Sequence, residues 1–165
     1  MIRSISIMSI LASFCTFKCM ADEGFMGFGL GAFNSAKFGP GEVKMYDLGY
    51  RWDTPQNIYW QAKGGFWGQG ANSEGMRSSG YASTGPGFRV DLNPVEFHTG
   101  AALALITTPD SYLGGVFQFN VDIGVTLRDK MGNGIGFAYS HLSSAGLEFP
   151  NQGRDFWVLE LSQRF

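Results

Sequence analysis

The chain has 165 residues, a length that suits one domain, and its formal net charge of −2 argues against a basic surface for nucleic acid. It contains 24 Gly and 15 Phe, and only 16% of its residues are charged, a composition unusual for a water-soluble protein. Glycine and aromatic residues are spread through short alternating runs, which points to β-structure rather than to helices.

Residues 1–21 have the features of a secretory signal peptide. Arg3 gives a positive start, residues 5–17 form an apolar core, and a small-x-small cleavage pattern ends at Ala21. An uncleaved anchor is the alternative, but the apolar stretch is shorter than the roughly 20 residues that a spanning helix needs. Cleavage leaves a mature chain, 22–165, without cysteine, which excludes disulfides and thiolate metal sites. With no acidic cluster either, we expect no metal and no cofactor.

Alternation of apolar and polar residues predicts eight strands along the mature chain. They lie at about 25–33, 43–52, 58–66, 80–90, 95–105, 117–125, 134–141 and 155–165. A Gly- and Ala-rich helix over 100–106 is a local alternative to the fifth strand. Short polar connections at 53–57, 92–94 and 128–133 join strands two and three, four and five, and six and seven.

The polar faces of these strands carry both signs of charge: Asp47, Glu96, Asp122 and Glu160 with Arg51, Lys63, Arg89 and Arg164. A barrel of eight strands has an interior that side chains can fill, so these charges would pair inside while the aromatic-rich face meets lipid. We therefore predict an all-β fold, an eight-stranded antiparallel transmembrane up-and-down β-barrel. A soluble, lipocalin-like barrel is the alternative. His98 falls on the polar face and is expected to form hydrogen bonds in the lumen.

The last predicted hairpin, 134–165, contains the candidate catalytic residues. His141 is followed two residues later by Ser143, and Asp155 comes after a short loop. The midpoint between His141 and Asp155 lies at residue 148, inside that loop, so the two can pair across the hairpin. Base, nucleophile and orienting acid would then converge, as an activated serine requires.

The pattern His-x-Ser-x-Ala-Gly-Leu, followed by Pro-Asn-x-Gly-x-acid, resembles the lipid A 3-O-deacylase family, outer-membrane esterases that trim lipopolysaccharide. The resemblance implies that His141 is the general base and Ser143 the nucleophile. Asp155 stands where the family usually has Glu, and Ser144 stands where Asn commonly follows the nucleophile. These two departures bear on the rate more than on the mechanism.

The same resemblance implies an oxyanion hole formed by the side chain of Asn151 and the backbone N–H of Gly146. Strand parity places the catalytic trio on the apolar, lipid-facing side. Phe137, Tyr139 and Trp157 share that side and are expected to line a groove for the acyl chain.

The resemblance, together with the strand pattern, thus implies a serine esterase of the bacterial outer membrane that removes the 3-O-linked hydroxyacyl chain of lipid A. If the N-terminus is periplasmic, the site faces the outer leaflet. The expected partners are lipopolysaccharide as substrate and outer-membrane lipids, and a homodimer stays open. Two alternatives remain: a non-enzymatic structural or adhesion barrel, and a general outer-membrane phospholipase or esterase.

Overall fold

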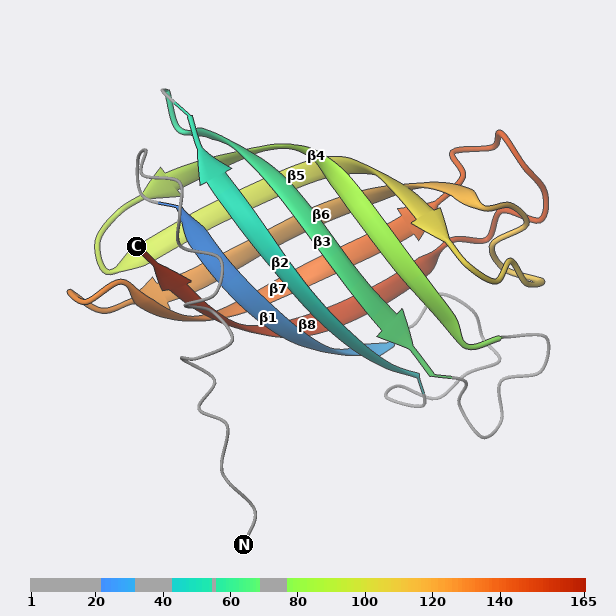
Figure 1. The fold of residues 1–165 in the computed structure, drawn as a ribbon, viewed down its shortest axis with the longest axis horizontal. Helices are drawn as coiled ribbons and strands as arrows, with labels where there is room; N and C mark the ends of the chain where they lie inside the picture. The colour runs from blue at the N-terminus through green and yellow to red at the C-terminus, as the bar shows by residue number, and fades with distance from the viewer. Residues whose placement is uncertain (1–21, 32–42, 55, 69–76) are drawn as a thin grey trace, which may run out of the picture.

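The computed structural model describes residues 22–31, 43–54, 56–68 and 77–165, and the predicted signal peptide lies outside these ranges. The described residues form one closed antiparallel barrel in which each strand pairs with its neighbours in sequence and β1 pairs with β8 (Figure 1). The strands are β1 (Glu23–Gly31), β2 (Lys44–Asp53), β3 (Ile58–Trp67), β4 (Ser79–Asp91), β5 (Val95–Ile106), β6 (Phe117–Arg128), β7 (Asn133–Ser143) and β8 (Arg154–Arg164). The predicted up-and-down barrel is confirmed.

The helical alternative for 100–106 is wrong, because this segment lies within β5 and is paired on both sides. Alternation of Ala and Leu puts the small residues inside the barrel and the large ones outside, so the segment fits a strand better than a helix. No helix in the described part of the chain is long and apolar enough to cross a membrane.

The two ends of the barrel differ. The β2–β3, β4–β5 and β6–β7 turns gather at one end, together with the C-terminus (Figure 1). There the backbone N–H of Phe165 donates to the carbonyl of Asp22, over 2.8 Å. The longer connections 107–116 and 144–153 lie at the opposite end. Short turns at one end and long loops at the other are typical of outer-membrane barrels.

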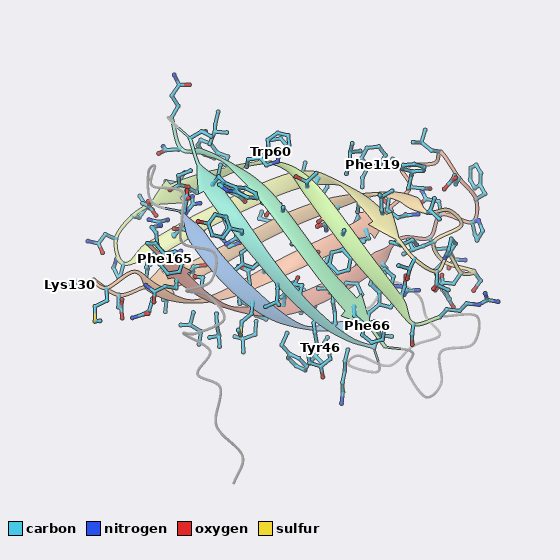
Figure 2. All side chains as sticks on the ribbon, in the orientation of Figure 1. Tyr46, Trp60, Phe66, Phe119, Lys130 and Phe165 are labelled. Atoms are coloured by element: carbon cyan, nitrogen blue, oxygen red, sulfur yellow. The ribbon has the colours of Figure 1, made fainter. Side chains whose placement is uncertain are left out.

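The outer wall is apolar along most of the described strands. Tyr46, Trp60 and Phe66 project outward, and each is about half exposed (Figure 2). So large an apolar surface marks a lipid or protein interface, since soluble monomers rarely expose patches beyond a few hundred Å². The soluble, lipocalin-like alternative is therefore disfavoured.

Charged side chains pair inside the lumen, as predicted, and the pairs around Glu23 lie toward the short-turn end. The Arg51 guanidinium donates to Glu23 over 3.3 Å and to Glu160 over 3.0 Å. Arg89 and Arg128 also contact Glu23, each over 3.0 Å, and the Glu23 side chain is fully buried. These ion pairs compensate charges that would otherwise be costly to bury.

Two lumen expectations need correction. Asp47 forms no ion pair in the described residues; instead, its carboxylate accepts a hydrogen bond from the Tyr81 hydroxyl over 2.9 Å. His98 is buried in the lumen, but neither ring nitrogen has a hydrogen-bond partner. Its Nε2 lies 3.7 Å from Glu160, whose carboxylate oxygens both accept from Arg51, so the guanidinium outcompetes the imidazole.

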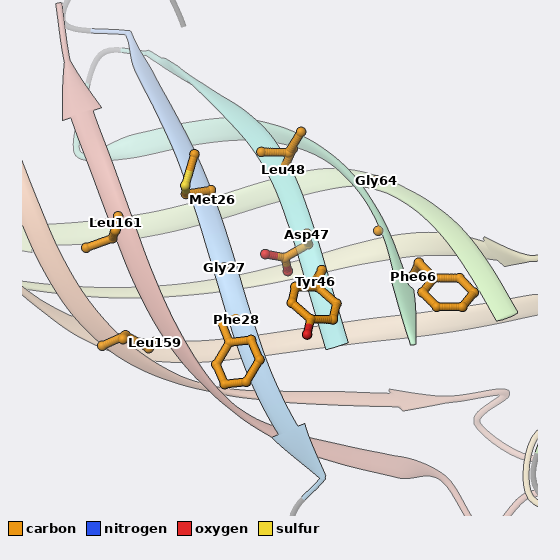
Figure 3. Close-up of a pocket in the computed structure, with 11 residues that line it drawn as sticks. Met26, Gly27, Phe28, Tyr46, Asp47, Leu48, Gly64, Phe66, Leu159 and Leu161 are labelled. Carbon is orange, nitrogen blue, oxygen red and sulfur yellow. The ribbon is translucent and has the colours of Figure 1, made fainter. Parts of the chain in front are cut away.

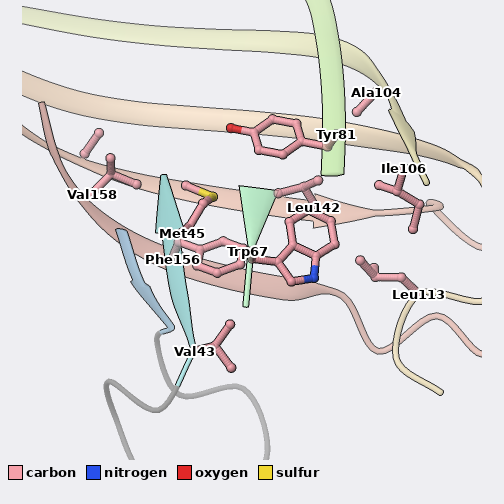
Figure 4. Packing of buried hydrophobic residues seen from close by; sticks show 11 residues of the cluster. Val43, Met45, Trp67, Tyr81, Ala104, Ile106, Leu113, Leu142, Phe156 and Val158 are labelled. Atoms are coloured by element: carbon pink, nitrogen blue, oxygen red, sulfur yellow. The ribbon is translucent and has the colours of Figure 1, made fainter. Parts of the chain in front are cut away.

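The long-loop end of the lumen is filled by a hydrophobic cluster (Figure 4). Leu142 of β7 and Phe156 of β8 belong to it and are fully buried. Because side chains alternate along a strand, anchoring these two residues inward turns His141, Ser143 and Asp155 outward. The packing of the core therefore sets the direction of the candidate site.

Candidate active site

The register of β7 and β8 places His141 directly opposite Asp155. The His141 Nδ1 and the Asp155 Oδ1 are 2.6 Å apart, a short hydrogen bond. The Asp155 side chain is 2% exposed, whereas the imidazole is 33% exposed. The carboxylate is thus covered, and the ring remains accessible from the lipid-facing side.

Ser143 lies on the same outward face of β7, two residues beyond His141. Two residues of strand separate their Cα atoms by about 7 Å, a gap that an imidazole can bridge. No hydrogen bond joins the two side chains within the described ranges. Hydrogen bonds of this kind are often long before substrate binds, so the arrangement is compatible with a base and its nucleophile.

Tyr139, which the sequence predicts only as a residue of the acyl groove, also contacts the acid. The Tyr139 hydroxyl donates to Asp155 Oδ1 over 2.5 Å, so the same oxygen is shared with His141. Residues 139, 141 and 143 share a face of β7 by alternation, which was the one available signal for this contact.

The β7–β8 loop brings Asn151 back beneath the end of β7. The Asn151 Oδ1 accepts a hydrogen bond from the backbone N–H of Ser144 over 2.8 Å, and the Ser144 hydroxyl donates to the carbonyl of Glu148 over 2.8 Å. With its oxygen engaged, Asn151 keeps its amide NH₂ as the free donor. Gly146 lies in the exposed part of the loop with a φ of 83°, a conformation that glycine adopts without strain.

Gly153 is a second residue whose role the sequence did not reveal. Its φ is 74°, and a Cβ at this position would lie 2.7 Å from His141 Cε1 and 3.4 Å from Nε2. Only glycine therefore leaves room for the imidazole at this point. Gly153 belongs to the quoted motif, but its contact with the ring depends on how the loop folds back.

The loop is held from the side by the β5–β6 connection. Asp110 accepts from the Arg154 guanidinium over 2.5 Å and from the backbone N–H groups of Tyr112 and Leu113. Leu113 forms an isolated β-bridge with Asn151. We call this set of contacts the loop latch; it fixes Asn151 and the residue just before Asp155.

On the short-turn side of the site, an outward-facing groove of about 470 Å³ runs over β5 to β8. All three residues predicted for the acyl chain line it: Phe137, Tyr139 and Trp157, together with Phe97, Ile123, Gly124 and Val125. A second outward groove, of about 440 Å³, lies over β1, β2, β3 and part of β8 and includes none of the site residues (Figure 3). The first groove is therefore the one that adjoins His141 and Asp155.

Comparison with known proteins identifies the family of the chain. The model of the family described as "Lipid A 3-O-deacylase (PagL)" matches residues 44–164. The chain belongs to the lipid A 3-O-deacylase family. The lipid A deacylase PagL of Bordetella bronchiseptica is 33% identical over 131 residues, covering 69% of this chain and 73% of that protein. The resemblance drawn from the motif is thus confirmed.

The solved structures support the fold. The crystal structure of the outer-membrane enzyme PagL matches with a TM-score of 0.66 at 21% identity, over 84% of this chain and 98% of that one. Neisserial surface protein A matches with a TM-score of 0.64 at 12% identity, over 88% and 96% of the two chains. Both likenesses concern the barrel itself.

The loop latch predicts a pH dependence at the long-loop end. Burial alone would raise the pKa of Asp110, but Arg154 and the backbone donors of Arg77 and Tyr112 together hold that pKa below its ordinary value. The latch should therefore be intact above about pH 4, the ordinary range of a free Asp, and be lost as pH falls through the lower folded value.

The measurement is the protection factor of the Gln152 amide, whose N–H donates to the carbonyl of Tyr112 over 3.0 Å. In wild type, the protection factor of this amide should decrease as the pH is lowered below about 4. Asp110→Asn should weaken it already at neutral pH. Asp129→Asn, in the β6–β7 turn at the opposite end, is the matched control and should leave it unchanged. Equal protection in wild type and Asp110→Asn would disprove the latch.

Proposed function

We propose that this chain is an outer-membrane esterase that hydrolyses the ester of the 3-O-linked hydroxyacyl chain of lipid A, using Ser143, His141 and Asp155. The observation that carries the proposal is the buried Asp155 carboxylate bonded to His141 on the lipid-facing wall. Polar groups are costly on such a surface unless they satisfy one another. An ester within a membrane lipid is reached from this side.

The first half of the reaction forms an acyl enzyme. The carboxylate accepts the Nδ1–H of His141, which leaves the Nε2 lone pair free to take a proton. His141 removes the proton from the Ser143 hydroxyl, and the serine oxygen attacks the ester carbonyl. The imidazolium that results is stabilised by Asp155.

The tetrahedral oxyanion is stabilised by the side-chain NH₂ of Asn151 and the backbone N–H of Gly146. The hydrogen bond from Ser144 to the Asn151 oxygen supports this role, because it directs the amide oxygen away and holds the NH₂ as donor. His141 then protonates the departing sugar oxygen. Water, deprotonated by the same imidazole, hydrolyses the acyl enzyme and releases the fatty acid.

The acyl chain lies in the groove over β5 to β8. Phe137 and Trp157 stack there with ring centroids 5.4 Å apart and an interplanar angle of 12°, which makes a flat apolar wall next to Asp155. All proposed groups come from one chain, so the reaction needs no homodimer. With the short turns in the periplasm, the site faces the outer leaflet, where lipid A resides.

Ser143→Ala should abolish deacylation, because it removes the nucleophile. Mass spectrometry of lipid A from cells expressing wild type should show loss of one 3-O-linked hydroxyacyl group, and cells expressing the variant should keep it. Ser140→Ala, on the lumen side of the same strand, is the control and should retain activity.

Deacylation by a folded Ser143→Ala barrel would disprove the serine mechanism. Unchanged lipid A in wild-type cells would favour a structural or adhesion barrel instead. Release of fatty acid from phospholipid as readily as from lipid A would favour the general esterase.

Asn151→Asp tests the oxyanion hole without disturbing the loop. The new carboxylate keeps an oxygen to accept the Ser144 N–H but loses the NH₂ and brings a negative charge toward the oxyanion. We expect kcat to fall by roughly 10²–10³-fold or more, the effect of losing one oxyanion donor, while the barrel still folds. A kcat within a few-fold of wild type would remove Asn151 from the mechanism.

A further inference from the structure

We infer that Tyr139 is a positioning residue of the site: its hydroxyl holds the Asp155 carboxylate in the orientation that pairs with His141. This inference deepens the proposed function and rests on it. It adds a fourth side chain to the trio, one that does not touch the reacting atoms.

The hydrogen bonds place both donors on one oxygen. Tyr139 Oη and His141 Nδ1 lie 2.5 Å and 2.6 Å from Asp155 Oδ1. The Asp155 side chain is 2% exposed on a wall that otherwise faces lipid. Water therefore cannot supply the hydrogen-bond donors that a solvated carboxylate would have. A buried anion of this kind needs more than one donor, and Tyr139 is the second.

The register explains why Tyr139 can reach the acid. His141 is directly opposite Asp155, and Tyr139 is directly opposite Trp157, so Tyr139 and Asp155 are diagonal neighbours across the hairpin. Diagonal neighbours on one face lie within reach of aromatic side chains. Tyrosine is long enough for its hydroxyl to reach the carboxylate along this diagonal, while the imidazole reaches it directly across the pair.

Packing fixes the tyrosine ring. Its centroid lies 5.1 Å from that of Trp157 at an interplanar angle of 60°, and Trp157 is in turn stacked on Phe137. The ring therefore has little freedom to turn its hydroxyl away from Asp155. The apolar wall of the groove and the orientation of the acid are thus built from the same aromatic residues.

The consequence concerns the His141 tautomer and orientation. Asp155 is one methylene shorter than Glu, so its oxygen reaches the imidazole only in a narrow range of side-chain orientations. With the Tyr139 hydroxyl in place, that orientation is held before substrate binds. Without it, the carboxylate can turn away and the Nδ1–H bond that presents Nε2 to Ser143 is weakened.

Tyr139→Phe is the test, because it keeps the ring in the groove and removes only the hydroxyl. We expect kcat to fall roughly 10-fold or more, the usual effect of losing a hydrogen bond to a charged group, with KM within about twofold of wild type. Tyr46→Phe is the matched control: Tyr46 is also an outward-facing tyrosine, lines the second groove and should change neither value. A loss confined to KM would make Tyr139 a groove residue only and would overturn the inference.

A second measurement is independent of turnover. In purified Ser143→Ala protein, the Nδ1–H proton of His141 should give a strongly downfield NMR signal that exchanges slowly. Adding Tyr139→Phe should move the signal upfield and speed its exchange, whereas adding Tyr46→Phe should not. An unmoved signal overturns the positioning role. A moved signal in a barrel whose wild type leaves lipid A intact keeps the positioning role and contradicts the proposed function.

Discussion

The hydrogen bond between His141 and Asp155 depends first on the register between β7 and β8, which places the two residues opposite each other. Leu142 and Phe156, each next to one of these residues, are buried in the lumen, and this fixes which face of the hairpin looks outward. A slip of one residue in either strand would turn its polar group into the lumen and its large apolar residue into the position of the site. The chemistry and the core are therefore set by the same pairing.

The lumen is filled differently at the two ends of the barrel. Toward the short turns, Arg51, Arg89 and Arg128 converge on Glu23. Each of these arginines also pairs with a second carboxylate, that of Glu160, Asp53 or Glu96, respectively. Toward the long loops, the core is apolar. The polar groups of the site and of the loop latch lie on the outer wall and in the loops instead. The ion-paired, short-turn end of the barrel thus supports a site whose hydrogen-bond donors come from strand ends and loops.

Much of this could be predicted from the sequence, because period-two alternation reports directly on the two faces of a barrel. The strands, the short turns and the pairing of His141 with Asp155 followed from alternation and from the symmetry of the hairpin. Contacts between distant segments did not: Asp110 is 44 residues from Arg154, and no local pattern links them. The bond from Tyr139 to Asp155 depends on rotamers across a diagonal, and the unpaired His98 depends on competition with Arg51 for Glu160, which pattern alone does not contain.

In the proposed mechanism, a serine on the lipid-facing wall is activated by a buried acid through one imidazole. The most direct test is to treat the folded barrel in detergent with a fluorophosphonate and to locate the adduct by peptide mass spectrometry. If Asp155 activates Ser143 through His141, a stoichiometric adduct should form on Ser143, and it should form much more slowly in Asp155→Asn. An active enzyme that acquires no adduct on Ser143, or is inactivated by modification elsewhere, would contradict it.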